Sequence, residues 1–358
     1  MTHQRPDYMP QLDAIRAIAV SAVMLHHFGS SAISRYFPNG LFGVRLFFVL
    51  SGFLITGILL RQRDRLASGD ATLSGIARTF YLRRALRLLP LYYLTLAVIG
   101  PMLSHALGTG WLWHVFYATN LCVAYTGTWC DFIPFWSLAV EEQFYMLWPW
   151  VILLAPDRWL WRMLVGSVIL APLVRVGVMG ATGNGLVAQV TLLGCLDSLA
   201  MGALLAAIVR KAEARALLES PFGRKAFATV GLSALMTSVA LHNWLGEDSL
   251  LTIGLQDSIL ALFNVWFVYR AAVGFGGWIG RCLSSTPLLR MGKISYGIYV
   301  VHTFVPLFVW IPAHLRGTPW EWVYRVGVFP SIAIMVAALS WYVIEGPLNR
   351  LKEHVEWT

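Results

Sequence analysis

An arginine and a histidine share one face of the first apolar segment of the chain. Arg16 and His27 are eleven residues apart in LDAIRAIAVSAVMLHH, so at about 100° per residue they differ by only about 20° around a helix. Their separation along the helix axis is about 16 Å, half of the hydrocarbon core of a bilayer. Histidine is the commonest general base in enzymes, which makes His27 a candidate catalytic residue. A helix-end histidine bonded to a carbonyl group is an equal alternative.

A carboxylate is expected at a similar depth on another helix. Glu141 in FWSLAVEEQFY lies about eight residues into the apolar segment that begins at Ile133 and enters from the opposite side. A carboxylate beside an imidazole fixes its tautomer and raises its basicity. The sequence therefore predicts a catalytic pair of His27 and Glu141, with Glu142, about 100° round the helix, as the alternative partner.

Three of the four arginines in RTFYLRRALRLLP offer a site for an anion. Arg84 and Arg87 are three residues apart and share a helix face, and Arg83 is adjacent. Guanidinium groups match phosphate oxygens in pairs, so the pattern predicts a phosphate clamp; anchoring at the membrane surface is the alternative. Ser51, in the glycine-containing segment GLFGVRLFFVLSGFLITG, leaves room for close helix packing or for an elongated ligand.

The elements that position these residues are membrane helices. Hydrophobic residues make up 58% of the 358 residues and charged residues 13%, about half of the ~25% of soluble proteins. We expect an all-α integral membrane protein of about ten transmembrane helices, a single domain over residues 1–358. The segment Leu112–Tyr125 is too short and is expected to be interfacial or re-entrant. The predicted spans are 12–28, 42–60, 86–104, 133–155, 159–179, 186–209, 226–241, 250–269, 294–312 and 324–344.

The basic residues predict the orientation. With a cytoplasmic N-terminus, 21 of the 27 Lys and Arg residues fall on the cytoplasmic side, as the positive-inside rule requires. Both termini are then cytoplasmic in a multi-pass protein of the inner membrane. The net charge of +9 is a topological signal, so membrane lipid is an expected partner and nucleic acid is not. The first segment carries no signal-peptide cleavage pattern.

Other polar residues in the spans have structural interpretations. We expect Arg175, Asp257 and Tyr145 to be structural partners in the bundle, and His302 to be a hydrogen-bonded bundle histidine. The four cysteines do not form a zinc site. Cys122 and Cys130 flank a loop on the non-cytoplasmic side, where they form either a disulfide or two unpaired small side chains. Four tryptophans on that side are either an interfacial belt or sugar-stacking groups: Trp111, Trp113, Trp129 and Trp136.

Six motifs in this order resemble the membrane acyltransferase family 3, bacterial O-acyltransferases that modify sugars. The motifs are LDAIRAIAVSAVMLHH, FGVRLFFVLSGFLITG, FYLRRALRLLP, FWSLAVEEQFY, MGKISYGIYVVHT and WYVIEGP. The resemblance covers nearly the whole chain and is to the stand-alone form that lacks a C-terminal esterase-like domain. It implies transfer of an acyl group, usually acetyl, from cytoplasmic acyl-CoA to a carbohydrate hydroxyl. The positions that it implies for this chemistry are Arg16, His27, Arg84, Arg87 and Glu141.

Two positions depart from the family pattern. Arg45 stands where the family usually has an acid, and Cys195 stands where a basic residue is expected. We expect these differences to affect the preference for acceptor or acyl chain rather than the reaction.

The residues and the resemblance together predict one mechanism. Arg84 and Arg87, helped by Arg83, hold the phosphates of acyl-CoA, which is a substrate, and no permanently bound cofactor or metal is expected. The pantetheine arm passes Ser51, Arg16 marks the inner end of the channel, and His27 acts as base or as acylated nucleophile. The alternative function is a transporter or flippase of a lipid-linked sugar, which would predict inverted repeats; none are evident.

Overall fold

The computed structural model describes residues 8–29, 31–107, 110–351, 355 and 357, and these residues form helices and connecting loops without any strand. This confirms the predicted all-α class. The single domain predicted over residues 1–358 stays a prediction.

Seven of the ten predicted spans correspond to one continuous helix each. The helices begin and end within a few residues of the prediction in most cases, but α4 begins thirteen residues earlier than residue 86, so that it carries the arginine motif inside one long helix. The helices are α1 (Pro10–Phe28), α3 (Asn39–Ala67), α4 (Leu73–Leu107), α7 (Phe135–Leu154), α8 (Asp157–Thr182), α12 (Pro221–Leu245) and α13 (Leu250–Val273).

Of the other three spans, two are interrupted and the last changes its helical geometry near its end. The span 186–209 is divided at Thr191 into α9 (Gly185–Val190) and α10 (Leu192–Val209), because the Thr191 hydroxyl accepts a hydrogen bond from the Gly194 amide and starts a new helix. The span 294–312 is broken into α16 (Ser295–Val301), a 3-10 turn (His302–Phe304) and α17 (Val305–Phe308). The last span is α18 (Pro319–Ser340), which continues through a π-helical turn (Trp341–Glu345) into α19 (Gly346–Leu351).

Seven helices among the described residues are long and apolar enough to cross a membrane. They are α3, α4, α8, α10, α12, α13 and the run from α18 to α19. The helices α1 and α7 do not meet this criterion; they have 19 and 20 residues and carry Arg16, His27 and Glu141. The chain is thus a multi-pass membrane protein, whereas the count of ten and the orientation stay predictions.

Short helices connect the long ones at both ends. Residues 112–125 form two helices of five and eight residues, α5 (Trp111–Val115) and α6 (Thr119–Thr126), which are too short to cross, as expected. The remaining connections contain α2 (Ser31–Tyr36), α11 (Ala212–Glu219), α14 (Gly277–Leu283) and α15 (Thr286–Lys293).

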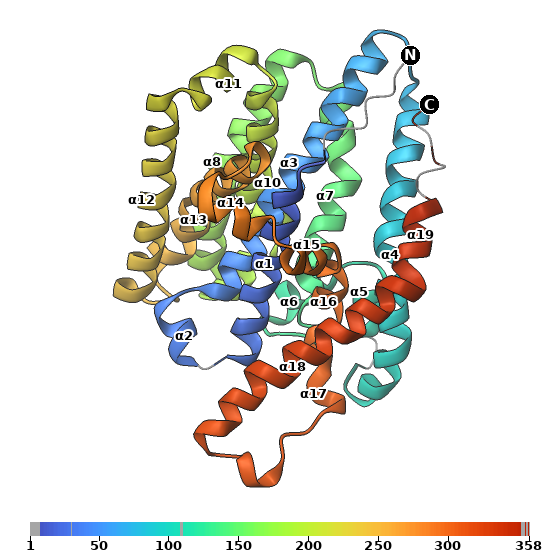
Figure 1. Cartoon of the computed structure of the whole chain (residues 1–358), viewed down its shortest axis with the longest axis vertical. Helices are drawn as coiled ribbons and strands as arrows, with labels where there is room; N and C mark the ends of the chain where they lie inside the picture. The colour runs from blue at the N-terminus through green and yellow to red at the C-terminus, as the bar shows by residue number, and fades with distance from the viewer. Residues whose placement is uncertain (1–7, 30, 108–109, 352–354, 356, 358) are drawn as a thin grey trace.

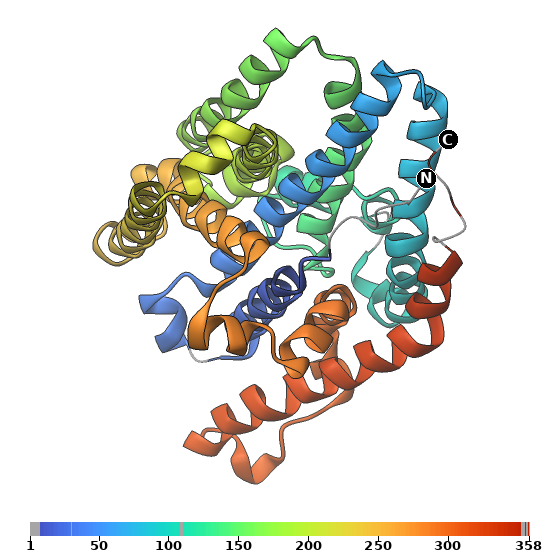
Figure 2. The same cartoon turned by 45° about the horizontal axis from the view of Figure 1, so that its top comes forward.

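Helix α3 occupies the middle of the bundle and packs against α1, α7, α10 and α13 (Figures 1 and 2). A Cβ atom added at Gly52 of α3 would lie 2.0 Å from the Leu199 carbonyl oxygen of α10. A Cβ atom added at Gly202 of α10 would lie 2.1 Å from the Val49 carbonyl oxygen of α3. Reciprocal glycines therefore let α3 and α10 touch backbone to backbone. For Gly52 this supports helix packing over ligand approach.

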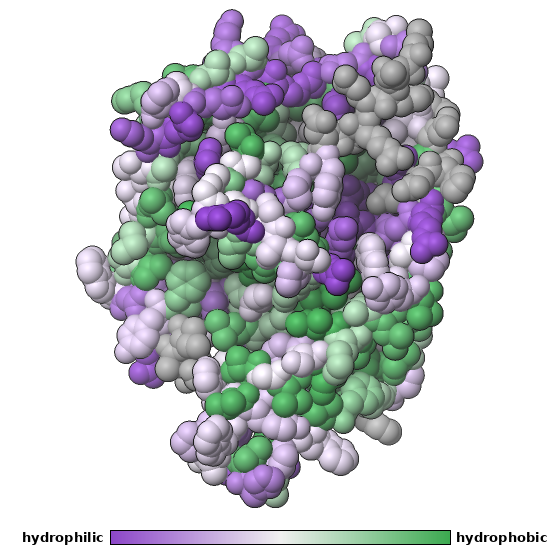
Figure 3. Space-filling model, in the orientation of Figure 1, coloured by the Kyte–Doolittle hydropathy of each residue, from purple (hydrophilic) through white to green (hydrophobic). Residues whose placement is uncertain are grey.

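Hydrophilic side chains gather along the upper end of the bundle, over α11, and hydrophobic side chains cover much of the lower right of this face, around α18 (Figure 3). A surface of this kind suits a protein whose flanks face lipid.

Candidate active site

Helix α1 places its two candidate residues in two different cavities. Arg16 lines a cavity of about 340 Å³, here called the arginine cavity, which lies among α1, α3, α4, α7 and α16. His27 lines a second cavity of about 410 Å³, here called the histidine cavity, at the other end of α1. The shared face predicted from the eleven-residue spacing therefore leads from one cavity to the other.

Four arginines line the arginine cavity: Arg16, Arg83, Arg84 and Arg87. Arg16 is bound to Asp13 at 2.6 Å. Arg84 lies over the Tyr145 ring at 5.3 Å from its centroid, but neither Arg84 nor Arg87 forms a hydrogen bond or ion pair with another described residue. Half-buried guanidinium groups without carboxylate partners are a binding site for an anion.

Arg83 has partners near the end of the chain. Its Nε and Nη2 donate to the Val355 carbonyl oxygen at 3.0 and 2.6 Å, and its guanidinium lies 5.3 Å from the centre of the Trp357 ring. The predicted group of three is therefore divided into two unpaired arginines and one that holds residues 355 and 357.

Ser51 and Glu141 meet in the same cavity. The Ser51 hydroxyl donates to Glu141 Oε1 at 2.7 Å, and the Tyr145 hydroxyl contacts both Ser51 Oγ at 3.0 Å and Glu141 Oε2 at 3.3 Å. Glu141 and Tyr145 both belong to α7, and their bonds to Ser51 join this helix to α3. The cavity thus combines cations at one part of its wall with a carboxylate and hydroxyl groups at another.

His27 is paired with another histidine. Its Nδ1 lies 2.9 Å from the Val23 carbonyl oxygen and 3.3 Å from His302 Nε2. His302 Nδ1 lies 2.8 Å from the Tyr299 carbonyl oxygen. A carbonyl oxygen only accepts, so both Nδ1 atoms carry hydrogen and His302 Nε2 is an acceptor for His27. The Nε2 atom of His27 is then left with a free lone pair, as a general base requires.

The predicted pair of His27 and Glu141 is not formed. Glu141 is hydrogen-bonded to Ser51 and Tyr145, and His27 to Val23 and His302, while the two residues line different cavities. Spacing gave both residues a similar depth but could not show which helices touch. Neither does Glu142 take the place of Glu141: its Oε2 atom is buried without a hydrogen-bond partner among the described residues.

The interpretation of His302 was correct in that it is buried and hydrogen-bonded. The sequence did not reveal that its partner is His27. Tyr299, which lines both cavities, was also missed. The signal that contained both residues is the motif MGKISYGIYVVHT.

The histidine cavity combines aromatic rings with polar side chains. Of the four tryptophans considered above, Trp129 and Trp136 line it, and Gln189 and Gln256 contribute amide groups. Such a wall can stack on a sugar ring and hydrogen-bond its hydroxyl groups.

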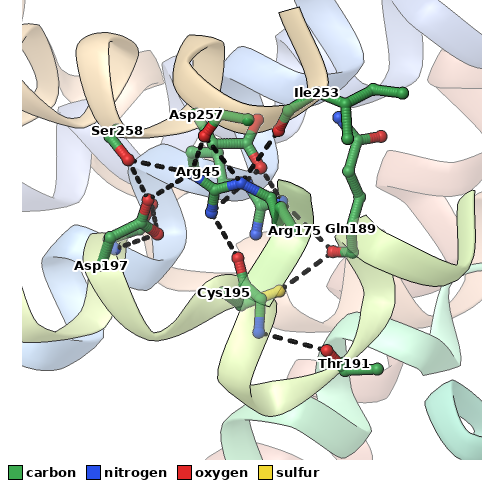
Figure 4. Close-up of polar contacts among 12 residues, drawn as sticks. Arg45, Arg175, Gln189, Thr191, Cys195, Asp197, Ile253, Asp257 and Ser258 are labelled. Atoms are coloured by element: carbon green, nitrogen blue, oxygen red, sulfur yellow. Dashed lines mark hydrogen bonds and ion pairs between the residues drawn. The ribbon is translucent and has the colours of Figure 1, made fainter. Parts of the chain in front are cut away.

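Next to this cavity lies a buried network of four charged side chains (Figure 4). Arg45 of α3 is paired with Asp257 of α13, and Arg175 of α8 is paired with Asp197 of α10 at 2.8 Å; all four are 0% exposed. The network ties four helices together, as expected for Arg175 and Asp257. Arg45, the departure from the family pattern, lines the histidine cavity, and Cys195 lies beside it, with its Sγ atom 3.1 Å from the Gln189 carbonyl oxygen.

Cys122 of α6 and Cys130 of the loop that follows it lie close together. Cys122 and Cys130 are free thiols with their Sγ atoms 2.8 Å apart, so the choice between a disulfide and two thiols stays open. Among the described residues, no group of three His, Cys, Asp or Glu side chains could hold a metal ion.

The chain is similar to known acyltransferases. A family model described as an acyltransferase domain matches residues 9–344. The O-acetyltransferase OatA of Staphylococcus aureus is 26% identical over 371 residues in strains NCTC 8325 / PS 47 and COL, covering 96% of this chain. The chain spans 58% of the length of these relatives. No solved structure matches it significantly. Since the family model covers nearly the whole chain, including the helices that build both cavities, the chain belongs to the membrane acyltransferase family 3, enzymes that transfer acyl groups.

Proposed function

We propose that the protein transfers an acyl group, acetyl by preference, from cytoplasmic acyl-CoA to a hydroxyl group of a carbohydrate or glycosylated acceptor. It does so in the cytoplasmic membrane, with both termini in the cytoplasm. The observation that carries the proposal is the position of Arg16 and His27, on one face of α1 but in two cavities. An anion site and a base are thereby held at opposite ends of one path through the bundle.

The arginine cavity binds the donor. Arg84 and Arg87 have no carboxylate partner and hold the phosphates of CoA, with a smaller contribution from Arg83, which is engaged at Val355. Acyl-CoA is a substrate in this scheme, and no resident cofactor takes part. Arg16 lies at the α1 wall of the same cavity.

The pantetheine arm lies along α3 and α7. Its amide groups need hydrogen-bond partners when they leave water, and the Glu141 carboxylate with the Ser51 and Tyr145 hydroxyls provides them. Glu141 therefore acts on the donor side of the reaction, rather than as the direct partner of His27.

The histidine cavity binds the acceptor. His27 Nε2 takes the proton of the acceptor hydroxyl while the hydroxyl oxygen forms a bond to the thioester carbonyl carbon. The carbon–sulfur bond then breaks, and the departing CoA thiolate receives the proton from His27. His302 holds the His27 ring in the tautomer that leaves Nε2 free. In a variant of this scheme, His27 Nε2 attacks the thioester itself, the carbon–sulfur bond breaks and CoA leaves as the thiolate, which gives an acyl-histidine. The acceptor hydroxyl then attacks the acyl carbon, the bond to Nε2 breaks, and the hydroxyl proton passes to the CoA thiolate.

The name of the OatA relatives, O-acetyltransferase, supports acetyl transfer to oxygen. The stacking surfaces of Trp129 and Trp136 support a carbohydrate acceptor. Membership of an acyltransferase family favours this enzyme over a transporter of lipid-linked sugar.

The test uses the purified full chain in detergent with labelled acetyl-CoA and a panel of sugars. We expect release of free CoA together with a labelled sugar, and we expect His27→Ala to lower both at least 100-fold, the size of a lost general base. The matched control is His314→Ala, since His314 is exposed and lines neither cavity. Full activity in His27→Ala would refute the mechanism. Sugar flux into liposomes without turnover of any acyl-CoA would support the transporter instead.

A further inference from the structure

Two residues belong to the walls of both cavities. Val44 of α3 and Tyr299 of α16 line the arginine cavity and also the histidine cavity. At this place the two cavities are separated by a single layer of side chains. We propose that Val44 and Tyr299 form a constriction through which the acyl end of the donor reaches His27, and that the size of Val44 limits the acyl group to a short chain. This inference rests on the proposed function.

The Tyr299 side of the constriction is fixed by hydrogen bonds. The Ser137 hydroxyl donates to the Pro134 carbonyl oxygen at 3.2 Å, so the Tyr299 hydroxyl, in contact with Ser137 Oγ, is the donor of that second bond. The Tyr299 ring lies edge-on to Phe47 at 5.8 Å. The ring is therefore held against α7 on one side and α3 on the other.

The Tyr299 side is also connected to the base. The Tyr299 carbonyl oxygen accepts from His302 Nδ1 at 2.8 Å, and His302 Nε2 contacts His27. Tyr299 thus contacts His302 directly, and His302 contacts His27. The constriction therefore lies next to the histidine pair, the place that the thioester carbonyl has to reach for the proposed transfer.

The Val44 side is fixed by the backbone of α3. At Gly43 an added Cβ atom would lie 2.5 Å from the Ala19 carbonyl oxygen of α1, so the two helices are in close contact. The next residue, Arg45, is buried and paired with Asp257 of α13 (Figure 4). Since α3 is held from both sides, the width of the opening depends on the side chain at position 44 rather than on movement of the helix.

The nature of the wall suits an acyl group. Val44, Phe47 and the ring of Tyr299 are apolar surfaces, whereas the polar groups lie on either side, at Ser51 and Glu141 in one cavity and at His27 in the other. An apolar layer accepts an alkyl chain and keeps acceptor-side water from the thioester. Each added methylene must fit beside Val44, which makes chain length the property that this layer selects.

The main test is Val44→Ala, with acetyl-, propionyl-, butyryl- and hexanoyl-CoA as donors. We expect the ratio of kcat/KM for butyryl-CoA to that for acetyl-CoA to rise about tenfold, since one methylene in an apolar pocket changes specificity by roughly 10–200-fold. The matched control is Val268→Ala: Val268 is 0% exposed and lines neither cavity. Its ratio should equal that of the wild type. An active Val44→Ala enzyme with the wild-type ratio would overturn the inference.

A second measurement keeps the inference testable if Val44→Ala folds poorly. Tyr299→Phe keeps the ring and removes the bond to Ser137, and Ser137→Ala removes the same bond from the other side. We expect both variants to raise hydrolysis of acetyl-CoA relative to transfer at least fivefold. A purely structural role would lower hydrolysis and transfer together, and that result would count against the constriction. If the wild type transfers no acyl group at all, both the proposed function and this inference are refuted. If the enzyme is active but the ratio of hydrolysis to transfer is unchanged in both variants, only the constriction is refuted.

Discussion

The sharpest test of the donor site is the removal of its two unpaired arginines. Arg84 and Arg87 line the arginine cavity without a hydrogen bond or ion pair to another described residue. Replacing either by Ala therefore leaves no protein carboxylate without an ion-pair partner. The substitution should weaken ligand binding and leave the stability of the fold unchanged. The variants are Arg84→Ala, Arg87→Ala and the double variant.

The size of the effect follows from the bonds that are lost. A hydrogen bond to a charged group contributes about 1.5–3 kcal/mol, and 1.4 kcal/mol corresponds to a factor of ten in Kd. Both arginines are only half-buried, and solvent screening places each near the lower value. We expect the Kd of CoA, and the KM of acetyl-CoA, to rise about tenfold for each single variant and about 100-fold for the double variant.

Arg83→Ala is the matched control on the same helix. Its guanidinium already donates twice to the Val355 carbonyl oxygen and lies over Trp357, so less of it is free for phosphate. We expect a smaller rise in KM than for Arg84→Ala.

The assay measures CoA binding by calorimetry and KM by CoA release, with acetyl-pantetheine as a second donor. Acetyl-pantetheine has no phosphate, so the variants should not change its KM. If the variants raise the KM of acetyl-CoA and of acetyl-pantetheine equally, or change neither, the phosphate clamp is refuted. Anchoring at the membrane surface is then the better explanation of the two arginines.

Three further predictions follow from other contacts. His302→Ala removes the acceptor at 3.3 Å from His27 Nδ1 and should lower kcat about tenfold without changing the donor KM; an unchanged kcat would leave His302 a packing residue. Arg175→Leu leaves the buried Asp197 carboxylate without its ion-pair partner and should destabilise the protein by about 3–5 kcal/mol. The double variant Arg175→Leu with Asp197→Leu should recover much of the lost melting temperature. Equal melting temperatures of the single and the double variant would contradict this. Burial and the neighbouring Cys122 raise the pKa of Cys130 to about 12. In reduced protein the alkylation of Cys130 should therefore be slow at pH 7 and should accelerate up to about pH 12, whereas the exposed Cys282 should react at pH 7. Mass spectrometry of the labelled protein measures the two alkylation rates separately.

Helical periodicity was sufficient for features within one element. The common face of Arg16 and His27, and the placement of Ser51 and Glu141 on apolar helices, depend only on spacing along a single segment and were predicted. The breaks at Thr191 and His302 were not, since a capping hydroxyl or a 3-10 turn inside an apolar run leaves the hydropathy unchanged.

Contacts between distant segments could not be predicted. His27 and His302 are 275 residues apart, and Arg45 and Asp257 are 212 residues apart. The spacing of residues within one segment does not indicate which other helix that segment will pack against. For the same reason Glu141 was assigned to His27, when its partners are Ser51 and Tyr145.

The buried ion network has a consequence for how the protein is made. A charged side chain costs up to about 2.5–3.5 kcal/mol on insertion, the value for the centre of a membrane helix. Arg45 lies nearer the end of its helix, since α3 begins at Asn39, and its cost is accordingly smaller. Asp197 follows Arg175 by only 22 residues, so α8 and α10 can neutralise each other soon after they leave the ribosome. Arg45 must wait for Asp257, 212 residues later, which at about 5–20 residues per second is roughly 10–40 s of synthesis. During this interval the Arg45 side chain lacks its carboxylate partner. Of the two pairs, this one therefore stays incomplete for longer during synthesis, and α3 depends more than α8 on the translocon until α13 is made.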